Sequence, residues 1–78
     1  MPEQVLVRFP NGIRVSWIQD KHGYWFSGLG KVMVQGLYTD IWNAEGRKLR
    51  IVPTGRRTVP EVLEDCTRTL LRKKTQAL

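Results

Sequence analysis

The stretch LYTDIWNAEGRKLRIV, residues 37–52, decides the fold because it can be interpreted as a β-hairpin outward from its turn. The turn Asn43-Ala44-Glu45-Gly46 suits a type I turn closed by a glycine in the left-handed region, which sets Asn43 opposite Arg47. The residues expected on the core face of this hairpin are Leu37, Thr39, Ile41, Leu49 and Ile51. The residues expected on the opposite face are Tyr38, Asp40, Trp42, Lys48, Arg50 and Val52.

That second face is basic and aromatic. The register places Trp42 beside Lys48, and it places Asp40 beside Arg50. Such cross-strand pairs stabilise a sheet by themselves, so a self-contained, solvated face is one interpretation. The other interpretation is a contact surface for a partner, because exposed aromatic patches are usually interaction sites.

A hairpin of the same kind is expected at the N-terminus, over residues 4–9 and 13–19. Pro10 suits the first position of its turn and Gly12 the left-handed third position. A three-residue loop puts six apolar residues on one face, whereas a two-residue loop would break up that face. The six residues are Val5, Val7, Phe9, Ile13, Val15 and Trp17.

A further hairpin is predicted over residues 24–26 and 31–35, around a four-residue turn at 27–30. We expect Phe26 opposite Val32 and Tyr24 opposite Val34 on the core face, with Trp25 on the outer face. The connection at residues 20–23 fits two loop lengths and stays open. The inward positions change from even to odd numbers beyond Val34, and a glycine β-bulge near Gly36 is the expected cause.

The C-terminal segment predicts a helix over about residues 58–74, with a frayed tail at 75–78. Thr58 and Glu61 match a capping box, with Pro60 in the first turn. Glu64 and Arg68 form an (i, i+4) pair on the solvent side. An apolar stripe at helical spacing faces the sheet and consists of Val59, Val62, Leu63, Cys66 and Leu70.

These elements predict an α+β fold in one domain over residues 1–78: an antiparallel β-meander of four to six strands packed on one C-terminal helix. The order of a small sheet and then a helix, over roughly residues 24–74, is similar to the sheet-reading DNA-binding domains of phage-type integrase N-termini and of the Apetala factors of plants. The resemblance is one of architecture and implies DNA binding; the N-terminal hairpin departs from its pattern. A small SH3-like barrel with an appended helix fits the same strands.

The charge of the chain is uneven. Residues 1–45 hold four basic and four acidic residues, whereas residues 46–78 hold nine basic and three acidic, which is the whole net charge of +6. Such asymmetry favours an anionic partner, with nucleic acid first. With one cysteine, no apolar run of membrane-spanning length and no secretory signal, we expect a cytoplasmic protein with no membrane partner.

No catalytic motif is present, so we expect no enzyme, no small-molecule substrate, no cofactor and no metal. His22 lies in an expected turn with no nucleophile fixed beside it, and Cys66 lies in the apolar stripe of the helix. No set of ligand residues has metal-site spacing. The sequence 28–31, Gly-Leu-Gly-Lys, lacks the full spacing of a phosphate-binding loop.

Nucleic-acid binding, DNA before RNA, is therefore the expected function. Aromatic side chains would supply apolar contact, Arg50 a contact to base edges, and the other basic residues contacts to phosphates. The competing hypothesis is a protein-binding module or small inhibitor that uses the same face of the sheet. In one form of this hypothesis, that face joins two copies of the chain in a homodimer. The candidate site residues are Trp25, Tyr38, Trp42, Arg47, Lys48, Arg50, Arg56 and Arg57.

Overall fold

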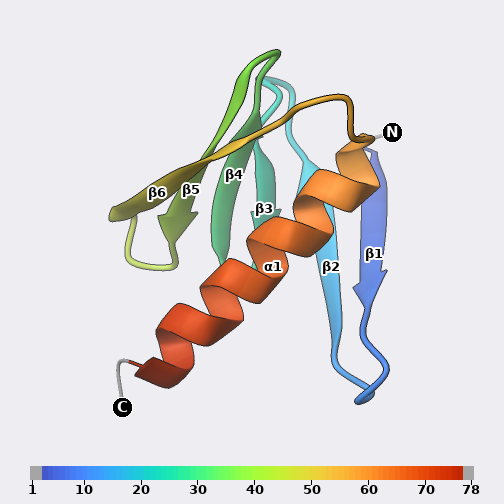
Figure 1. Cartoon of the computed structure of the whole chain (residues 1–78), viewed down its shortest axis with the longest axis vertical. Helices are drawn as coiled ribbons and strands as arrows, with labels where there is room; N and C mark the ends of the chain where they lie inside the picture. Colours follow the sequence, from blue (N-terminus) through green and yellow to red (C-terminus); the bar gives the residue numbers. More distant parts are fainter. Residues whose placement is uncertain (1–2, 77–78) are drawn as a thin grey trace.

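The structure, a computed structural model, describes residues 3–76, with side chains described for residues 3–73. Six antiparallel strands form one sheet in which each strand pairs with its neighbours along the chain, and a C-terminal helix packs on one face (Figure 1). This arrangement confirms the α+β meander. The elements are β1 (Gln4–Arg8), β2 (Arg14–Gln19), β3 (Trp25–Ser27), β4 (Gly30–Val34), β5 (Tyr38–Asn43), β6 (Lys48–Pro53) and α1 (Val59–Gln76).

The N-terminal hairpin has the predicted register. Val5 lies opposite Trp17 in the ladder between β1 and β2, and Phe9 N–H donates to the carbonyl of Ile13 across the three-residue loop. The following connection, which the sequence leaves open, is also a three-residue loop, because Asp20 N–H donates to the carbonyl of Tyr24. This loop length fixes Trp17 on the helix side and leaves Ile18 outside.

The hairpin of β3 and β4 has a different register from the predicted one. Trp25 lies opposite Val32, and Ser27 lies opposite Gly30, so the loop has two residues rather than four. The slip by one residue exchanges the two faces of β3, because side chains alternate along a strand. Trp25 is therefore buried in the core at 2% exposure, and Phe26 is exposed at 44%. The prediction that Trp25 lies on the outer face is wrong.

The expected bulge at Gly36 is absent from the ladder of β4 and β5. Gln35 N–H donates to the carbonyl of Tyr38, so Gly36 lies in a two-residue turn, and this turn changes the numbering of inward positions from even to odd. A register shift lies instead between β5 and β6, beside Ile41 and Trp42, and leaves Leu49 as the extra residue of β6.

The shift changes which residues of β6 face the core. Asp40 lies opposite Ile51, not Arg50, and Val52 is buried at 4% exposure while Ile51 is exposed at 49%. Leu37 is also exposed, at 78%. The assignment of Leu37 and Ile51 to the core and of Val52 to the outer face is therefore wrong, whereas that of Thr39 and Ile41, both fully buried, is confirmed.

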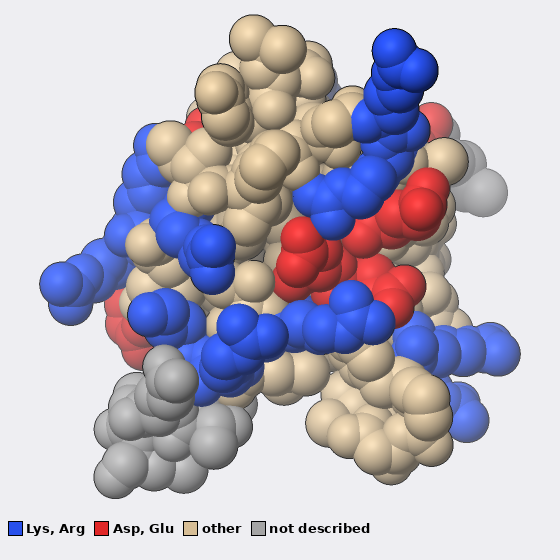
Figure 2. Space-filling model, in the orientation of Figure 1, with Lys and Arg blue, Asp and Glu red and all other residues tan. Residues whose placement is uncertain are grey.

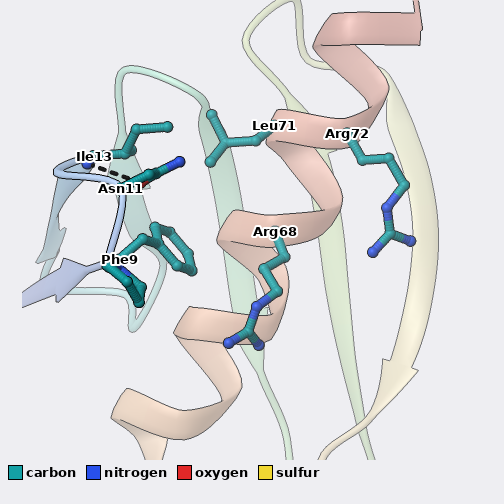
Figure 3. A pocket seen from close by; sticks show the side chains of 7 residues that line it. Phe9, Asn11, Ile13, Arg68, Leu71 and Arg72 are labelled. Atoms are coloured by element: carbon teal, nitrogen blue, oxygen red, sulfur yellow. Dashed lines mark hydrogen bonds between the residues drawn. The ribbon is translucent and has the colours of Figure 1, made fainter.

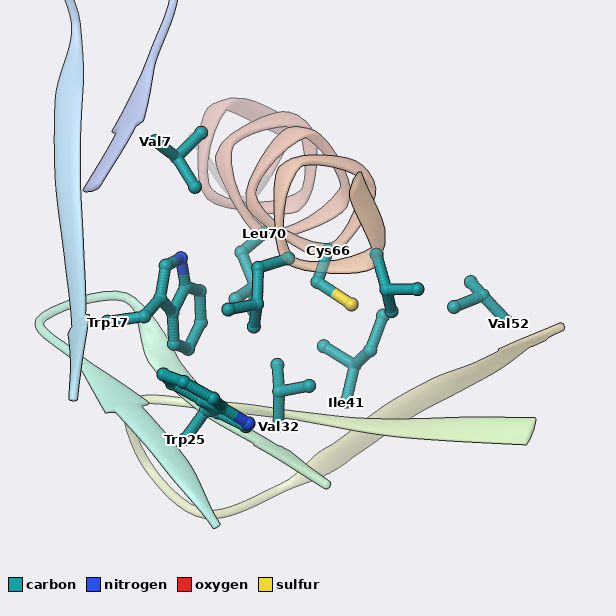
Figure 4. Close-up of a cluster of buried hydrophobic side chains, with 10 residues drawn as sticks. Val7, Trp17, Trp25, Val32, Ile41, Val52, Cys66 and Leu70 are labelled. Carbon is teal, nitrogen blue, oxygen red and sulfur yellow. The ribbon is translucent and has the colours of Figure 1, made fainter. Parts of the chain in front are cut away.

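The core fills the space between the inner face of the sheet and α1 (Figure 4). Trp17 is fully buried and its Nε1–H donates to Thr67 Oγ1 at 2.9 Å, and that hydroxyl donates to the carbonyl of Leu63 at 2.6 Å. The buried indole N–H of Trp17 thus has a hydrogen-bond acceptor on α1, and buried polar groups generally need such a partner. The buried apolar residues are Val7, Trp17, Trp25, Val32, Ile41, Val52, Val62, Leu63, Cys66 and Leu70.

The helix begins as its sequence predicts. Thr58 N–H donates to Glu61 Oε1 at 2.9 Å, and Glu61 N–H donates to Thr58 Oγ1 at 3.4 Å, which is the capping box. The Glu61 carboxylate accepts hydrogen bonds from the Thr58 backbone N–H and from the Thr58 hydroxyl, and these two bonds, the backbone one first, lower the pKa of Glu61. The helix continues to Gln76, two residues beyond the expected end at about residue 74, and residues 77–78 of the expected tail lie outside the described residues.

Candidate nucleic-acid interface

The outer face of the sheet is convex, because the six strands curl around α1 and leave their other side uncovered by any described element (Figure 1). The middle of this face carries a group of side chains from β3, β4, β5, β6 and the loop before β3. We call this group the outer cluster; its members are Tyr24, Phe26, Lys31, Trp42 and Lys48.

The strand register builds the outer cluster. Lys31 lies directly opposite Phe26 on one side and Trp42 on the other, and Trp42 lies opposite Lys48. Residues directly opposite in adjacent strands share a face, so these four side chains form one row across the sheet. Tyr24 joins this row from the loop before β3, with its ring centroid 6.0 Å from that of Trp42 and edge-on to it.

Two ammonium groups lie against these rings. Lys31 Nζ is 4.6 Å from the ring centroid of Trp42 and 4.8 Å from that of Tyr24, and Lys48 Nζ is 5.8 Å from Trp42. A cation over an aromatic face at an exposed site is worth about 0.5–1 kcal/mol. That amount orders the two lysines without holding them tightly.

The lysines differ in their acidic neighbours. Lys48 Nζ is 3.1 Å from Asp40 Oδ1, and Gln35 Nε2 donates to the other carboxylate oxygen at 2.8 Å. Among the described residues, Lys31 has no ion pair with a carboxylate. In the part of the chain that the structure describes, the ammonium group of Lys31 therefore contacts aromatic rings but no carboxylate.

The structure brings some of the sequence-predicted residues together and separates others. Trp42, Lys48 and Tyr38 lie on the outer face; Trp42 is half-buried and Tyr38 is 59% exposed. Arg50 lies opposite the buried Ile41 and not beside Asp40. Directly opposite residues share a face, so the assignment of Arg50 to the outer face is wrong, although its side chain is exposed. Trp25 belongs to the core, as described above.

The three remaining arginines do not form one patch. Arg47 lies in the turn before β6 and Arg56 in the loop after it, so the six-residue strand separates them by roughly 20 Å. Both are exposed, and Arg56 has no hydrogen bond or ion pair among the described residues.

Arg57 has a structural task. Its Nη1 donates to Asp65 Oδ2 at 2.8 Å, its Nε donates to the carbonyl of Thr54 at 3.3 Å, and its Nη2 donates to the carbonyl of Pro53. The guanidinium thus joins the end of β6 to the second turn of α1. Three of the five N–H donors of Arg57 are therefore engaged within the chain, and two remain for the phosphate contact expected from the sequence.

Three members of the outer cluster were missed by reasoning from the sequence. The sequence pattern assigns Tyr24 and Phe26 to the core and gives Lys31 no role, because it predicts a four-residue loop between β3 and β4 where the structure has two residues. The signal that could have corrected this is Lys31 itself. A four-residue loop leaves this lysine beside the turn, whereas a two-residue loop places it between two aromatic residues.

The outer face also carries exposed apolar side chains. Leu6 is 42% exposed, Ile18 is 46% exposed, and Ile18 lies directly opposite Phe26 in the ladder of β2 and β3. Ile51 adds a further exposed aliphatic side chain, opposite Asp40. The outer cluster therefore continues toward β1 and β6 as a mixed, partly apolar surface.

The helix side of the molecule has a different charge pattern. Figure 2 shows acidic side chains gathered among basic ones on this face, and the acidic residues of α1 are Glu61, Glu64 and Asp65. Arg68 forms an ion pair with Glu64 and Arg57 with Asp65, so part of the positive charge is neutralised locally.

An open notch of about 430 Å³ lies between the first hairpin turn and the later part of α1 (Figure 3). Phe9 and Ile13 line it from the hairpin, and Arg68 and Arg72 line it from the helix. Arg68 lies 5.5 Å from the ring centroid of Phe9 and is also the partner of Glu64. These contacts account for Arg68 within the fold.

The residues considered for catalysis have ordinary structural surroundings. His22 is exposed in the loop after β2, where its N–H donates to Asp20 Oδ1 at 2.9 Å. Cys66 is fully buried, and burial raises the pKa of its thiol to about 12, which opposes formation of the reactive thiolate. Among residues 3–73, no three His, Cys, Asp or Glu side chains come together as metal ligands would.

A search for membrane-spanning segments among the described residues finds no helix with the length and apolar character needed to cross a bilayer. Comparison of the chain with protein-family models, with curated proteins and with solved structures finds no match.

Proposed function

We propose that this chain binds DNA without catalysing a reaction, and that it contacts DNA with the outer cluster. One observation carries the proposal: Lys31 and Lys48 lie over the ring of Trp42 in the middle of an uncovered sheet face. Basic groups interleaved with aromatic rings match the two parts of a nucleic acid, the phosphates and the apolar surfaces of the bases.

The steps of binding follow from the strength of these contacts. A phosphate offers the ammonium group of Lys31 a charged hydrogen bond, which is stronger than the cation–π contacts that it replaces. When Lys31 moves toward a phosphate, it uncovers the faces of Tyr24 and Trp42. Phe26, already 44% exposed, extends the same apolar surface.

The convex shape of the sheet favours duplex DNA as the ligand. The major groove of B-form DNA is about 12 Å wide and admits strands, whereas the major groove of A-form RNA is too narrow for side chains to read. The exposed Arg47 and Arg56 lie beyond the two ends of β6, and we expect them to contact backbone phosphates on either side of the groove.

The exposed apolar residues favour a second candidate function, a protein-binding module. Leu6, Ile18 and Phe26 are each more than two-fifths exposed on the outer face, and such side chains form the centres of protein interfaces. The two functions differ in salt dependence. Neutralising several phosphates releases counterions, so DNA affinity falls steeply with salt, whereas an apolar protein interface responds weakly.

The experiment measures the Kd of fluorescently labelled duplex DNA, single-stranded DNA and RNA by anisotropy at several salt concentrations. The test variant is Lys31→Gln with Lys48→Gln. The matched control is Arg68→Gln with Arg72→Gln, which removes the same charge from the helix side. We expect the test variant to raise the Kd for duplex DNA about tenfold and to reduce the salt slope by about 2, because each lost phosphate contact lowers it by about 1.

The control should change Kd much less than the test variant. Equal losses in the two double variants would mean that net charge alone drives binding, and the outer cluster would be excluded as the site. A wild-type chain that binds none of the three nucleic acids at low salt would contradict the function itself.

A further inference from the structure

We propose that the free edge of β1 is a self-association surface, at which a second copy of this chain adds its own β1 in antiparallel orientation. The first observation is the hydrogen-bond pattern of the first hairpin. Gln19 N–H donates to the carbonyl of Glu3, and Phe9 N–H donates to the carbonyl of Ile13. In an antiparallel ladder, residues that bond to the neighbouring strand alternate with residues that do not. The odd-numbered residues of β1 therefore bond to β2.

The even-numbered residues of β1 present their backbone groups to the outside. The N–H and carbonyl groups of Gln4, Leu6 and Arg8 point away from β2, and β1 is the first strand of the sheet. No backbone hydrogen bond from another described segment reaches these three residues. A regular row of unpaired groups on an extended strand is a template for another strand.

The opposite edge of the same sheet lacks such a row. On β6, the extra residue Leu49 interrupts the spacing, and Pro53 has no N–H and its carbonyl already accepts a bond from Arg57. Ile51 is left as the regular outward-facing position. Bulges, prolines and charged side chains are the usual protections of an edge strand. β6 has all three of these features. β1, by contrast, has neither a bulge nor a proline between Gln4 and Arg8.

The sequence of β1 is complementary to itself in one register. With a two-fold axis at Leu6, the N–H and carbonyl of Leu6 meet those of Leu6 of the partner subunit. Arg8 then lies opposite Gln4 of the partner subunit, and no two like charges face each other. A closed two-fold interface needs the same patch on both copies, and this register provides it.

Side chains on both faces support the same register. Leu6 is 42% exposed on the outer face, and pairing with its own copy would cover it. Val5 is half-buried on the inner face, and it would lie opposite Val7 of the partner subunit. The occupant is therefore a strand with alternating aliphatic residues and one basic end, which is the chemistry of β1 itself.

The experiment measures the molar mass of the full chain by sedimentation equilibrium over a series of concentrations up to about 1 mM, which spans weak association. We expect the mass to rise from one copy toward two. Leu6→Lys places like charges opposite each other at the axis and should weaken association at least about tenfold. Ile18→Lys is the matched control, because it puts the same charge on a similarly exposed aliphatic position one strand away from the edge.

A second variant and a second measurement address folding. Leu6→Pro removes an N–H that the isolated chain does not use, so it should keep the circular dichroism spectrum and lose association. Amide hydrogen exchange of the wild type should slow at Leu6 and Arg8 as concentration rises, with Val7 unchanged.

A mass of one copy at all concentrations would overturn the proposal, as would equal association of Leu6→Lys and wild type. The result is independent of DNA binding, which is measured at concentrations where one copy predominates.

Discussion

Trp25 and Trp42 are the same residue type on nearby strands, yet they belong to opposite faces of the sheet. Trp25 packs against the helix side at 2% exposure, whereas Trp42 lies on the outer face beneath two lysines. The inner position is fixed by close packing and the outer one by register and weak cation–π contacts. An aromatic residue in a strand is therefore committed to core or surface by the length of the adjoining turn, not by its own chemistry.

The largest expected effect separates the two tryptophans by stability. Trp25→Ala should lower the free energy of unfolding by about 3–5 kcal/mol, because it leaves a cavity in a packed core. Trp42→Ala should lower it by about 1–2 kcal/mol, because the half-buried ring loses less apolar contact. Urea denaturation of both variants measures the difference. Equal losses would contradict the division into a packing face and a contact face.

A smaller effect is expected at the polar contact of the inner face. Thr67→Val removes the acceptor of Trp17 Nε1–H and keeps the shape of the side chain. A buried donor left without a partner costs about 1–3 kcal/mol, so the melting temperature should fall. Thr67→Ser, which retains the hydroxyl, is the control and should recover part of the loss. A Thr67→Val variant as stable as wild type would mean that the indole N–H finds another acceptor.

The corresponding polar contact on the outer face should matter less. Asp40→Asn removes the charge that faces Lys48 at 3.1 Å, where the side chain of Lys48 is 48% exposed. Exposed ion pairs contribute about 0.2–1 kcal/mol, so we expect a loss within that range at low salt and less at high salt. Thermal unfolding at two salt concentrations measures it. A loss of stability as large as that of Thr67→Val would show that the ion pair on the outer face contributes as much to folding as the buried hydrogen bond.

The smallest effect concerns pH at the helix start. Hydrogen bonds from Thr58 lower the pKa of Glu61 below its ordinary value, so ionised Glu61 favours the folded state. This contribution is fully present above the unfolded pKa and is lost as pH falls through the folded pKa. Glu61→Gln should therefore be less stable than wild type at neutral pH and converge with it in acid. A difference that is constant with pH would contradict this role of the charge.

The parts of the fold that the sequence predicts correctly are those with local turn chemistry. Pro10 and Gly12 specify a three-residue loop, and Thr58 and Glu61 specify the helix start. The predicted turn at residues 43–46 is also present, with Asn43 bonded to Arg47. Each of these signals involves residues within a few positions of one another. They determine the registers nearest to them, and the correct inner faces of β1 and β2 follow.

The incorrect parts depend on interactions that local patterns do not specify. Ser27-Gly28-Leu29-Gly30 permits two loop lengths, and packing decides between them: at Gly30 a Cβ would lie 2.1 Å from the carbonyl oxygen of Trp42. The extra residue Leu49 carries no glycine or proline to mark it. Two of the five members of the outer cluster, Tyr24 and Phe26, are consequently assigned to the core from the sequence, whereas Trp42 and Lys48 are assigned to the correct face.

The distribution of the three tryptophans gives the molecule a built-in optical readout. Indole emission responds to polarity and to nearby charge, and Trp17 and Trp25 lie in the dry interior while Trp42 lies against ammonium groups at the surface. Titration of a ligand onto the outer face would alter the signal of one indole, whereas denaturation would shift all three. A Trp42→Phe chain would silence the first response and preserve the second, so occupancy and folding could be followed in one unlabelled sample.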